Sequence, residues 1–141
     1  MLESVVEMEV PFHDSDPMGV TWHGNYFRYL ETARSALLDR IGYNYRQMSE
    51  SGYLWPVVDA RIKYIRPTTF GQRLRVTAKL AEYENRLRIV YTIADVASGE
   101  VVTEATTTQV AVHGERREMS FVSPPVFVDK VRAALNATVK K

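Results

Sequence analysis

Residues 13–34 read HDSDPMGVTWHGNYFRYLETAR, and this stretch determines how the rest of the chain is interpreted. Pro17 and Gly19 interrupt regular structure, so residues 13–24 are expected to form a loop. From Asn25 onward apolar residues recur every three to four positions, which predicts a helix that ends near Gly42. An acidic loop therefore leads directly into the longest expected helix, whose apolar stripe comprises Tyr26, Leu30, Ala33, Leu37 and Ile41.

The segments on either side of this loop and helix alternate apolar and polar residues, the pattern of half-buried strands. The first such strand precedes the loop, at residues 6–12. An irregular polar-aromatic stretch is expected at 43–54, and a short helix at 126–139. Between them we expect strands at 58–64, 74–80, 87–93 and 101–112, separated by turns at Gly71, Glu84-Asn85 and Ser98-Gly99.

The resulting order, β-α-β-β-β-β, predicts an α+β fold in which a curved antiparallel sheet wraps around one long helix. A single helix and a single sheet must cover each other's apolar faces. The threonine- and valine-rich strand at 101–112 suggests that the outer face is also partly apolar. Such a face and an open sheet edge need cover, so we expect a homodimer or homotetramer. The length and the lack of repeats or linkers predict one domain over residues 1–141.

Composition narrows the possible functions. A formal net charge of +1 gives no reason to expect nucleic acid or a membrane as partner. The chain has no cysteine, which excludes disulfides, a thiol nucleophile and thiolate metal sites. No apolar run approaches the roughly 20 residues that span a bilayer, and the acidic start does not resemble a leader, so a cytoplasmic location is expected.

Two aspartates in the loop, Asp14 and Asp16, have two interpretations. Either could cap the turn before Pro17, because Asp side chains often accept from the backbone two residues on. Alternatively, one could act chemically, since the following helix start supplies unpaired N–H groups and a positive dipole end for a developing oxyanion. Gly24 lacks a side chain, so a substrate could approach the backbone closely there.

The stretch from Phe12 to Arg34 resembles the signature of the 4-hydroxybenzoyl-CoA thioesterase family of hotdog-fold proteins. The similarity lies in the core D-S-D-P-M-G-V-T-W-H-G-N-Y and the following L-E-T-A-R. A weaker similarity continues through V-V-D-A-R-I-K-Y-I-R-P-T-T-F-G-Q and N-R-L-R-I-V-Y, so that most of residues 5–112 is covered. The resemblance implies hydrolysis of an acyl thioester, of coenzyme A or of an acyl-carrier protein, to a free acid and a thiol.

The resemblance also implies roles for individual residues. Asp16 corresponds to the essential carboxylate, as nucleophile or as general base for water, and the amide at His23 would polarise the thioester carbonyl. A thiolate departs without a strong acid, because its free pKa is near the value of about 8.5 of cysteine. One carboxylate and an oxyanion site then suffice. The three histidines have no metal-ligand spacing and no G-x-S-x-G is present, so neither a metal nor a cofactor is expected.

Other candidates around the helix start each have a structural alternative. Glu31 is the reserve catalytic candidate, because some hotdog thioesterases use a helix-borne carboxylate from a neighbouring subunit, but it could pair with Arg34 three positions on. Trp22 is a candidate for the acyl pocket or for a packing role. Asn25 is expected to cap the helix rather than to hold the loop. Tyr26 is expected in the core or at an interface.

Coenzyme A carries phosphates, so basic residues should converge on its nucleotide. The candidates for binding coenzyme A lie on a hairpin and on the strand expected to border the pantetheine; they are Asp59, Arg61, Arg86 and Arg88, with Lys63 and Arg66 nearby. Each charge alone is typical of a solvated strand face. Together the basic residues of this set could form a phosphate clamp.

Two alternatives to a thioesterase come from other classes. Hydratases and dehydratases with a hotdog fold tend to need a histidine paired with an acid in a different loop pattern. A non-catalytic acyl-thioester-binding or regulatory module would keep the pocket and dispense with Asp16.

Overall fold

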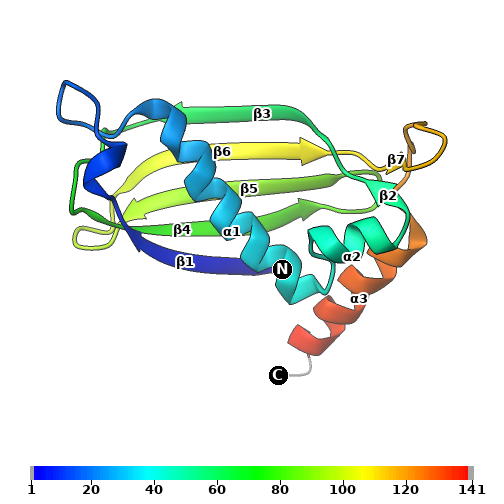
Figure 1. Ribbon diagram of the computed structural model, residues 1–141. Helices are drawn as coiled ribbons and strands as arrows, with labels where there is room; N and C mark the ends of the chain where they lie inside the picture. The colour runs from blue at the N-terminus through cyan, green and yellow to red at the C-terminus, as the bar shows by residue number, and fades with distance from the viewer. Residues whose placement is uncertain (1, 140–141) are drawn as a thin grey trace.

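The computed structural model describes residues 2–139, which form a five-stranded antiparallel sheet with a long helix across one face and a small two-stranded sheet (Figure 1). The sheet order is β1-β4-β5-β6-β3, and the helix α1 spans Tyr26–Ile41. The α+β prediction and the wrapped helix are thus confirmed. The strands are β1 (Glu3–Glu9), β3 (Val57–Tyr64), β4 (Arg73–Glu82), β5 (Leu87–Asp95) and β6 (Val101–Gln109).

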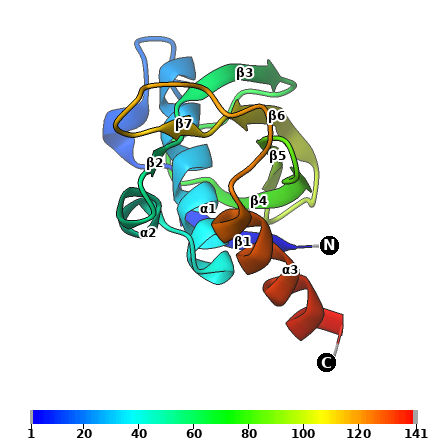
Figure 2. The ribbon, with the colours of Figure 1, turned by 90° about the vertical axis from the view of Figure 1, so that its right-hand side faces the viewer.

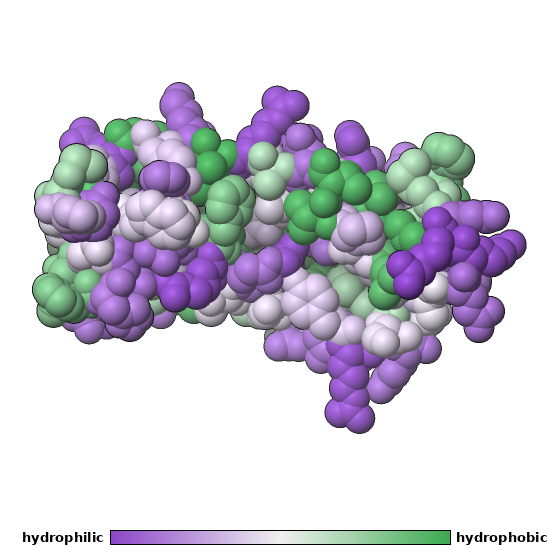
Figure 3. Space-filling view, turned by 45° about the horizontal axis from the view of Figure 1, so that its top comes forward, coloured by the Kyte–Doolittle hydropathy of each residue, from purple (hydrophilic) through white to green (hydrophobic). Residues whose placement is uncertain are grey.

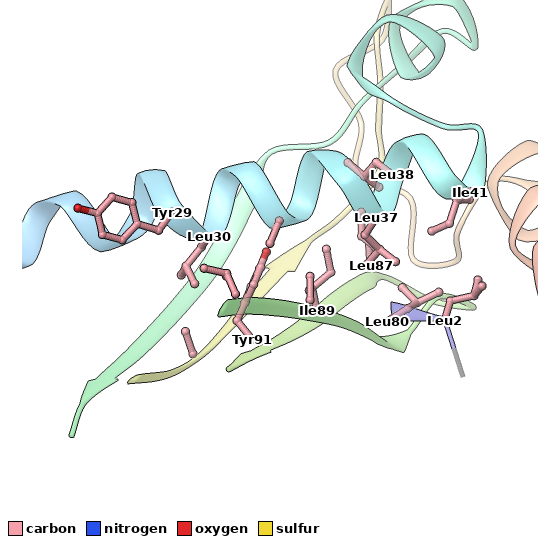
Figure 4. Packing of buried hydrophobic residues seen from close by; sticks show 14 of the residues in the cluster. Leu2, Tyr29, Leu30, Leu37, Leu38, Ile41, Leu80, Leu87, Ile89 and Tyr91 are labelled. Carbon is pink, nitrogen blue, oxygen red and sulfur yellow. The ribbon is translucent and has the colours of Figure 1, made fainter. Parts of the chain in front are cut away.

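The core lies between α1 and the inner face of the sheet (Figure 4). Leu30, Ala33 and Leu37 of the predicted stripe are buried, and alternate residues of β4 and β5 meet them, namely Leu74, Val76, Ala78, Leu80, Leu87, Ile89, Tyr91 and Ile93. Burying each large aliphatic side chain contributes about 1.5–3 kcal/mol. The helix ends at Gly42, whose φ of +81° is the left-handed conformation that favours glycine at this position.

The prediction of an irregular stretch at 43–54 is wrong for its middle, which is the helix α2 (Tyr45–Glu50). The local sequence feature that indicates this helix is a capping box. The Asn44 side chain accepts from Gln47 N–H, and the Gln47 side chain accepts from Asn44 N–H. The predicted last strand ends at Gln109, and a short ladder of β2 (Tyr53–Leu54) with β7 (Val112–His113) follows. The terminal helix is confirmed as α3 (Pro125–Val139).

The outer face of the sheet is mainly charged, and the prediction of a partly apolar face is wrong for most of it. Helix α1 covers only the inner face among the described residues (Figure 2). On the outer face, Arg73 and Arg75 pair with Glu7, and Lys79 pairs with Glu3. The threonines of β6 that face outward lie between β5 and β3, next to Arg88 and Arg61, so this face is compatible with water.

The edge strand β3 is more apolar than the outer face. Seven of its eight residues are exposed, and Val57, Val58 and Tyr64 are between 42% and 56% exposed. Figure 3 looks towards this edge and shows hydrophobic groups among the hydrophilic ones. An apolar, unpaired edge is a site for association with another strand. Among residues 2–139, no helix is long and apolar enough to span a membrane.

Candidate active site

The loop after β1 is a tight turn built around Asp16. The Asp16 N–H donates to the Val20 carbonyl at 2.8 Å, and its own carbonyl accepts from Gly19 N–H at 3.0 Å. Its carboxylate oxygen Oδ1 accepts from Met18 N–H at 2.8 Å. The turn-capping role is therefore real. It leaves the second oxygen without a hydrogen bond among the described residues, so capping does not exclude a chemical role.

Asp16 lies on a cavity of about 260 Å³ at the N-terminal end of α1. The lining residues come from the loop, from the helix start and from the end of β3: Asp16, Met18, Val20, Thr21, His23, Tyr26, Tyr64, Ile65, Arg66 and Pro67. Three predicted site residues, Asp16, His23 and Tyr26, are thus brought together. The sequence did not identify Tyr64 as a site residue, because the alternating pattern of its strand does not show which residue faces the helix start.

The backbone at the helix start is held by Tyr64. A 3₁₀ turn, η2 (His23–Asn25), leads into α1, and the first N–H groups of a helix have no intrahelical acceptor. The Tyr64 hydroxyl donates to the His23 carbonyl at 3.0 Å, which fixes the peptide between His23 and Gly24. The N–H groups of His23 and Gly24 belong to this 3₁₀ turn, which lies beside the cavity.

Trp22 and Gly24 are arranged differently from the prediction. A Cβ atom at Gly24 would clash with the Trp22 indole, so the open side of the glycine is filled by this ring rather than left for a substrate. Trp22 is half exposed and covers Gly24 instead of lining the cavity. The structural alternative for Trp22, packing beside the turn, is the one observed.

A chain of buried hydroxyls supports the cavity wall. The Thr21 hydroxyl donates to the Thr68 carbonyl at 3.1 Å, and the Thr68 hydroxyl donates to Thr21 Oγ1 at 2.6 Å. The Thr68 proton is thereby used, so the Tyr26 hydroxyl is the donor in its 2.9 Å bond to Thr68 Oγ1. Tyr26 is buried as predicted, and its ring is fixed as part of the wall.

Asp14 is the buried member of the aspartate pair, with 2% of its side chain exposed. Its Oδ2 accepts from the Tyr29 hydroxyl at 2.5 Å, and its Oδ1 pairs with Arg28 Nη2 at 2.6 Å. Burial by itself raises the pKa of this carboxyl, but the hydrogen bonds from Tyr29 and Arg28 and the nearby positive charge outweigh it, so the net pKa is lowered. Because both oxygens are engaged, Asp14 has a structural role.

Asn25 holds the loop, and the prediction that it caps the helix is wrong. Its Nδ2 donates to the Asp14 carbonyl at 2.9 Å, and its Oδ1 accepts from Arg28 at 3.0 Å. A capping residue usually has an extended backbone, whereas Asn25 already has helical dihedral angles because it is the last residue of the 3₁₀ turn. Its side chain is therefore directed to the loop.

Glu31 lies in a polar cluster between α1 and α2. It forms the predicted ion pair with Arg34 and accepts from the Tyr45 hydroxyl at 3.1 Å. Arg34 is buried and donates to Gln109 at 3.1 Å. Glu31 does not belong to the cavity of Asp16 in the same chain.

The four residues predicted to bind coenzyme A lie together in a separate hollow. This hollow, of about 260 Å³, is lined by Asp59, Arg61, Arg86, Arg88, Thr106 and Thr108. Arg61 pairs with Asp59 at 3.4 Å, and Arg86 pairs with Glu82 at 2.8 Å. The hollow is on the outer face, near the beginning of β3, whereas the Asp16 cavity is at the other end of β3 and beside α1. The basic residue on the Asp16 cavity is Arg66.

Comparisons with known proteins agree with this arrangement. The sequence profile of the Thioesterase-like superfamily matches residues 10–135. The Bacillus subtilis (strain 168) protein YneP, whose assignment as an acyl-CoA thioesterase is provisional, is 34% identical over 110 residues, which cover 77% of this chain and 79% of YneP. The 1,4-dihydroxy-2-naphthoyl-CoA hydrolase of Thermosynechococcus vestitus (strain NIES-2133 / IAM M-273 / BP-1) is 29% identical over 83% of this chain and 81% of its own.

A solved structure shows the same fold. The DHNA-CoA thioesterase of Staphylococcus aureus superposes with a TM-score of 0.82 over 99% of this chain and 93% of its own, at 23% identity. The chain therefore belongs to the Thioesterase-like superfamily, and the predictions of a hotdog fold and of a thioester hydrolase are confirmed.

The network around Asp14 predicts a pH-dependent contribution to stability. We expect Asp14→Asn to lower the free energy of unfolding at pH 7 by about 1–3 kcal/mol, because buried partners lose an ionised acceptor. Since the folded-state pKa is lowered, this contribution is complete above the unfolded pKa of about 3.9 and disappears as pH falls through the folded value. Urea unfolding of both proteins between pH 7 and pH 2.5 measures it. A difference between them that stays constant over this range would contradict the assignment.

Proposed function

We propose that this protein is an acyl-CoA thioesterase that hydrolyses an acyl thioester to a free acid and a thiol. The observation that carries the proposal is the half-buried Asp16 carboxylate, which faces a cavity at the start of α1. The names of YneP and of the 1,4-dihydroxy-2-naphthoyl-CoA hydrolase support a coenzyme A thioester as substrate. A thioester of an acyl-carrier protein would present the same reacting group, and direct comparison of the two thiol carriers distinguishes them.

In the proposed reaction the thioester carbonyl oxygen points to the N–H groups of His23 and Gly24. The helix dipole also stabilises the negative charge that develops on this oxygen. The free oxygen of Asp16 attacks the carbonyl carbon, or removes a proton from a water that attacks it. The C–S bond then breaks and the electron pair leaves on sulfur as thiolate. In the first route this leaves a mixed anhydride on Asp16, which water hydrolyses to the free acid and the regenerated carboxylate. In the second route the acid forms directly, and the proton held by Asp16 passes to the thiolate. Tyr64 acts as a positioning residue, because it holds the His23 carbonyl and so orients the peptide.

We further propose that the active unit is a homodimer, or a dimer of dimers, formed by antiparallel pairing of the β3 edges. A two-fold axis perpendicular to the sheet places one residue opposite its own copy. With Ala60 at this point, Asp59 lies opposite Arg61 of the partner subunit. Opposite charges across strands are stabilising, whereas centring on Arg61 would place this residue opposite its own copy.

The first prediction for this function concerns the aspartate pair. Asp16→Asn should lose nearly all turnover of acyl-CoA while circular dichroism shows an unchanged fold, because the amide can neither attack nor accept the proton from water. Asp14→Asn should retain measurable turnover, since Asp14 only supports the loop. Thiol release across a panel of acyl chain lengths is the assay. An inactive Asp14→Asn beside an active Asp16→Asn would contradict the assignment. Unchanged turnover in Asp16→Asn would likewise exclude its catalytic role.

The second prediction concerns the hollow on the outer face. Replacing Arg86 and Arg88 by alanine should raise KM for acyl-CoA about tenfold or more with kcat nearly unchanged, the pattern of lost uniform binding. A pantetheine thioester, which has no nucleotide, should be unaffected. The matched control is the double replacement of Arg73 and Arg75, which lie on the same face but outside the hollow. Equal effects on both substrates would remove the nucleotide assignment.

The third prediction concerns the β3 edge. Asp59→Arg should raise the dimer dissociation constant about tenfold or more, because two symmetric pairs of roughly 1 kcal/mol each become repulsive. Adding Arg61→Asp should restore association, since the exchanged charges are again complementary. Light scattering over a dilution series measures both. A wild-type protein that is a stable, active monomer at assay concentration would rule out the dimer.

A further inference from the structure

A second cavity lies at the opposite end of β3 from Asp16. It measures about 570 Å³ and is lined by Leu54, Trp55, Pro56, Val112 and Arg117. Four of these five residues are apolar. Figure 2 shows β2, β7 and the segment after β7 on the same side of the sheet as α1. The cavity therefore lies on the face of the sheet where Asp16 is, but at the wrong end of the strand to serve Asp16 of its own chain (Figure 1).

The β3 pairing proposed above brings this cavity to the Asp16 site of the other subunit. In this antiparallel pairing the end of β3, at Tyr64, lies beside the beginning of the partner subunit's β3, at Val57. Residues 65–66 follow Tyr64 and residues 54–56 precede Val57, so these two segments come near each other across the interface. Residues 64–66 line the Asp16 cavity, and residues 54–56 line the second one. A two-fold axis perpendicular to the sheet also keeps both cavities on the α1 side.

Arg117 is the charged residue of the second cavity. It has a φ of +58°, which is unusual for a residue other than glycine. Its N–H donates to the His113 carbonyl at 2.7 Å, and His113 N–H donates to the Glu118 carbonyl at 2.8 Å, so the turn that carries it is closed at both ends. No carboxylate among the described residues pairs with its guanidinium. The cation is thus available at the rim of an apolar cavity.

We propose that the cavity around Trp55 forms the distal part of the acyl pocket that begins at Asp16 of the partner subunit. Arg117 at its rim selects acyl groups with an apolar body and a negatively charged end. This inference rests on the proposed thioesterase function and on the β3 dimer. It assigns the choice of substrate to the subunit that does not supply the carboxylate.

Two substrates of equal carbon number test the selection, hexanoyl-CoA and adipoyl-CoA, which end in a methyl group and a carboxylate. The wild-type protein should have the higher kcat/KM for adipoyl-CoA. Arg117→Asn should lower kcat/KM for adipoyl-CoA about 10- to 100-fold, which corresponds to the loss of one charge-assisted hydrogen bond. Its kcat/KM for hexanoyl-CoA should change little. Asparagine is chosen because it tolerates a positive φ. The matched control is Arg116→Asn, an adjacent exposed arginine that is not part of the cavity lining.

Mixed dimers test which subunit supplies Arg117. Subunits with Asp16→Asn and subunits with Arg117→Asn are co-expressed with different affinity tags, and the heterodimer is purified through both. One of its two sites combines an intact Asp16 with an intact Arg117 of the other subunit. We therefore expect the heterodimer to recover about half of the wild-type turnover of adipoyl-CoA, whereas each parent homodimer turns over this substrate far more slowly.

The outcomes separate this inference from the function on which it rests. If the wild-type protein releases no thiol from these two esters or from any acyl-CoA of the panel, the proposed function itself is overturned; if it hydrolyses other members of the panel but neither of these two, the selective role of Arg117 is overturned alone. If it hydrolyses both, but Arg117→Asn alters both equally or neither, the selective role of Arg117 is overturned alone. If Arg117→Asn is selective but the heterodimer does not recover, Arg117 acts on its own chain and the shared pocket is excluded.

Discussion

The buried carboxylate of Asp14 is the constraint on which the candidate site depends. Its two oxygens bind Tyr29 and Arg28 on the first turn of α1. Its carbonyl accepts from Trp22 N–H and from the Asn25 side chain. One residue thus joins the beginning of the loop to its end and to the helix. A buried charge is tolerable only when it is paired and hydrogen-bonded, so the loop has little freedom to adopt another arrangement at this point.

The surroundings of the two aspartates differ in a way that fits a structural role for Asp14 and the proposed chemical role of Asp16. They are two residues apart, yet Asp14 is enclosed and fully bonded, while Asp16 uses one oxygen for its turn and keeps the other for the cavity. The turn-capping bond from Met18 also restricts the rotation of the Asp16 side chain. A carboxylate that is both restrained and partly free is suited to act on a substrate held at a fixed place, because positioning lowers the entropic cost of reaction.

The sequence predicted the elements with strong periodicity and missed those fixed by individual contacts. The α1 stripe and the alternating strands could be recognised because each period repeats over many residues. Helix α2 has only six residues, and its capping box was the single local signal. Tyr64 was missed as a cavity residue because its place depends on the end of β3 reaching the helix start, a long-range contact. Arg66 was expected near the other coenzyme A residues, whereas it lies on the Asp16 cavity. Asn25 was misjudged because it is part of the 3₁₀ turn that leads into α1, so its backbone is already helical.

Strand β3 relates these local features to the assembly. One end of it carries Tyr64, which holds the helix start, and the other end follows Leu54 and Trp55 of the second cavity. In one chain the two cavities are separated by the length of the strand, about 3.3 Å for each of its residues. Antiparallel pairing of two such strands brings each end beside the other's beginning. In the proposed dimer the exposed apolar edge, the carboxylate with its small cavity and the second cavity become parts of one arrangement, in which each site takes its carboxylate from one subunit and its second cavity from the other.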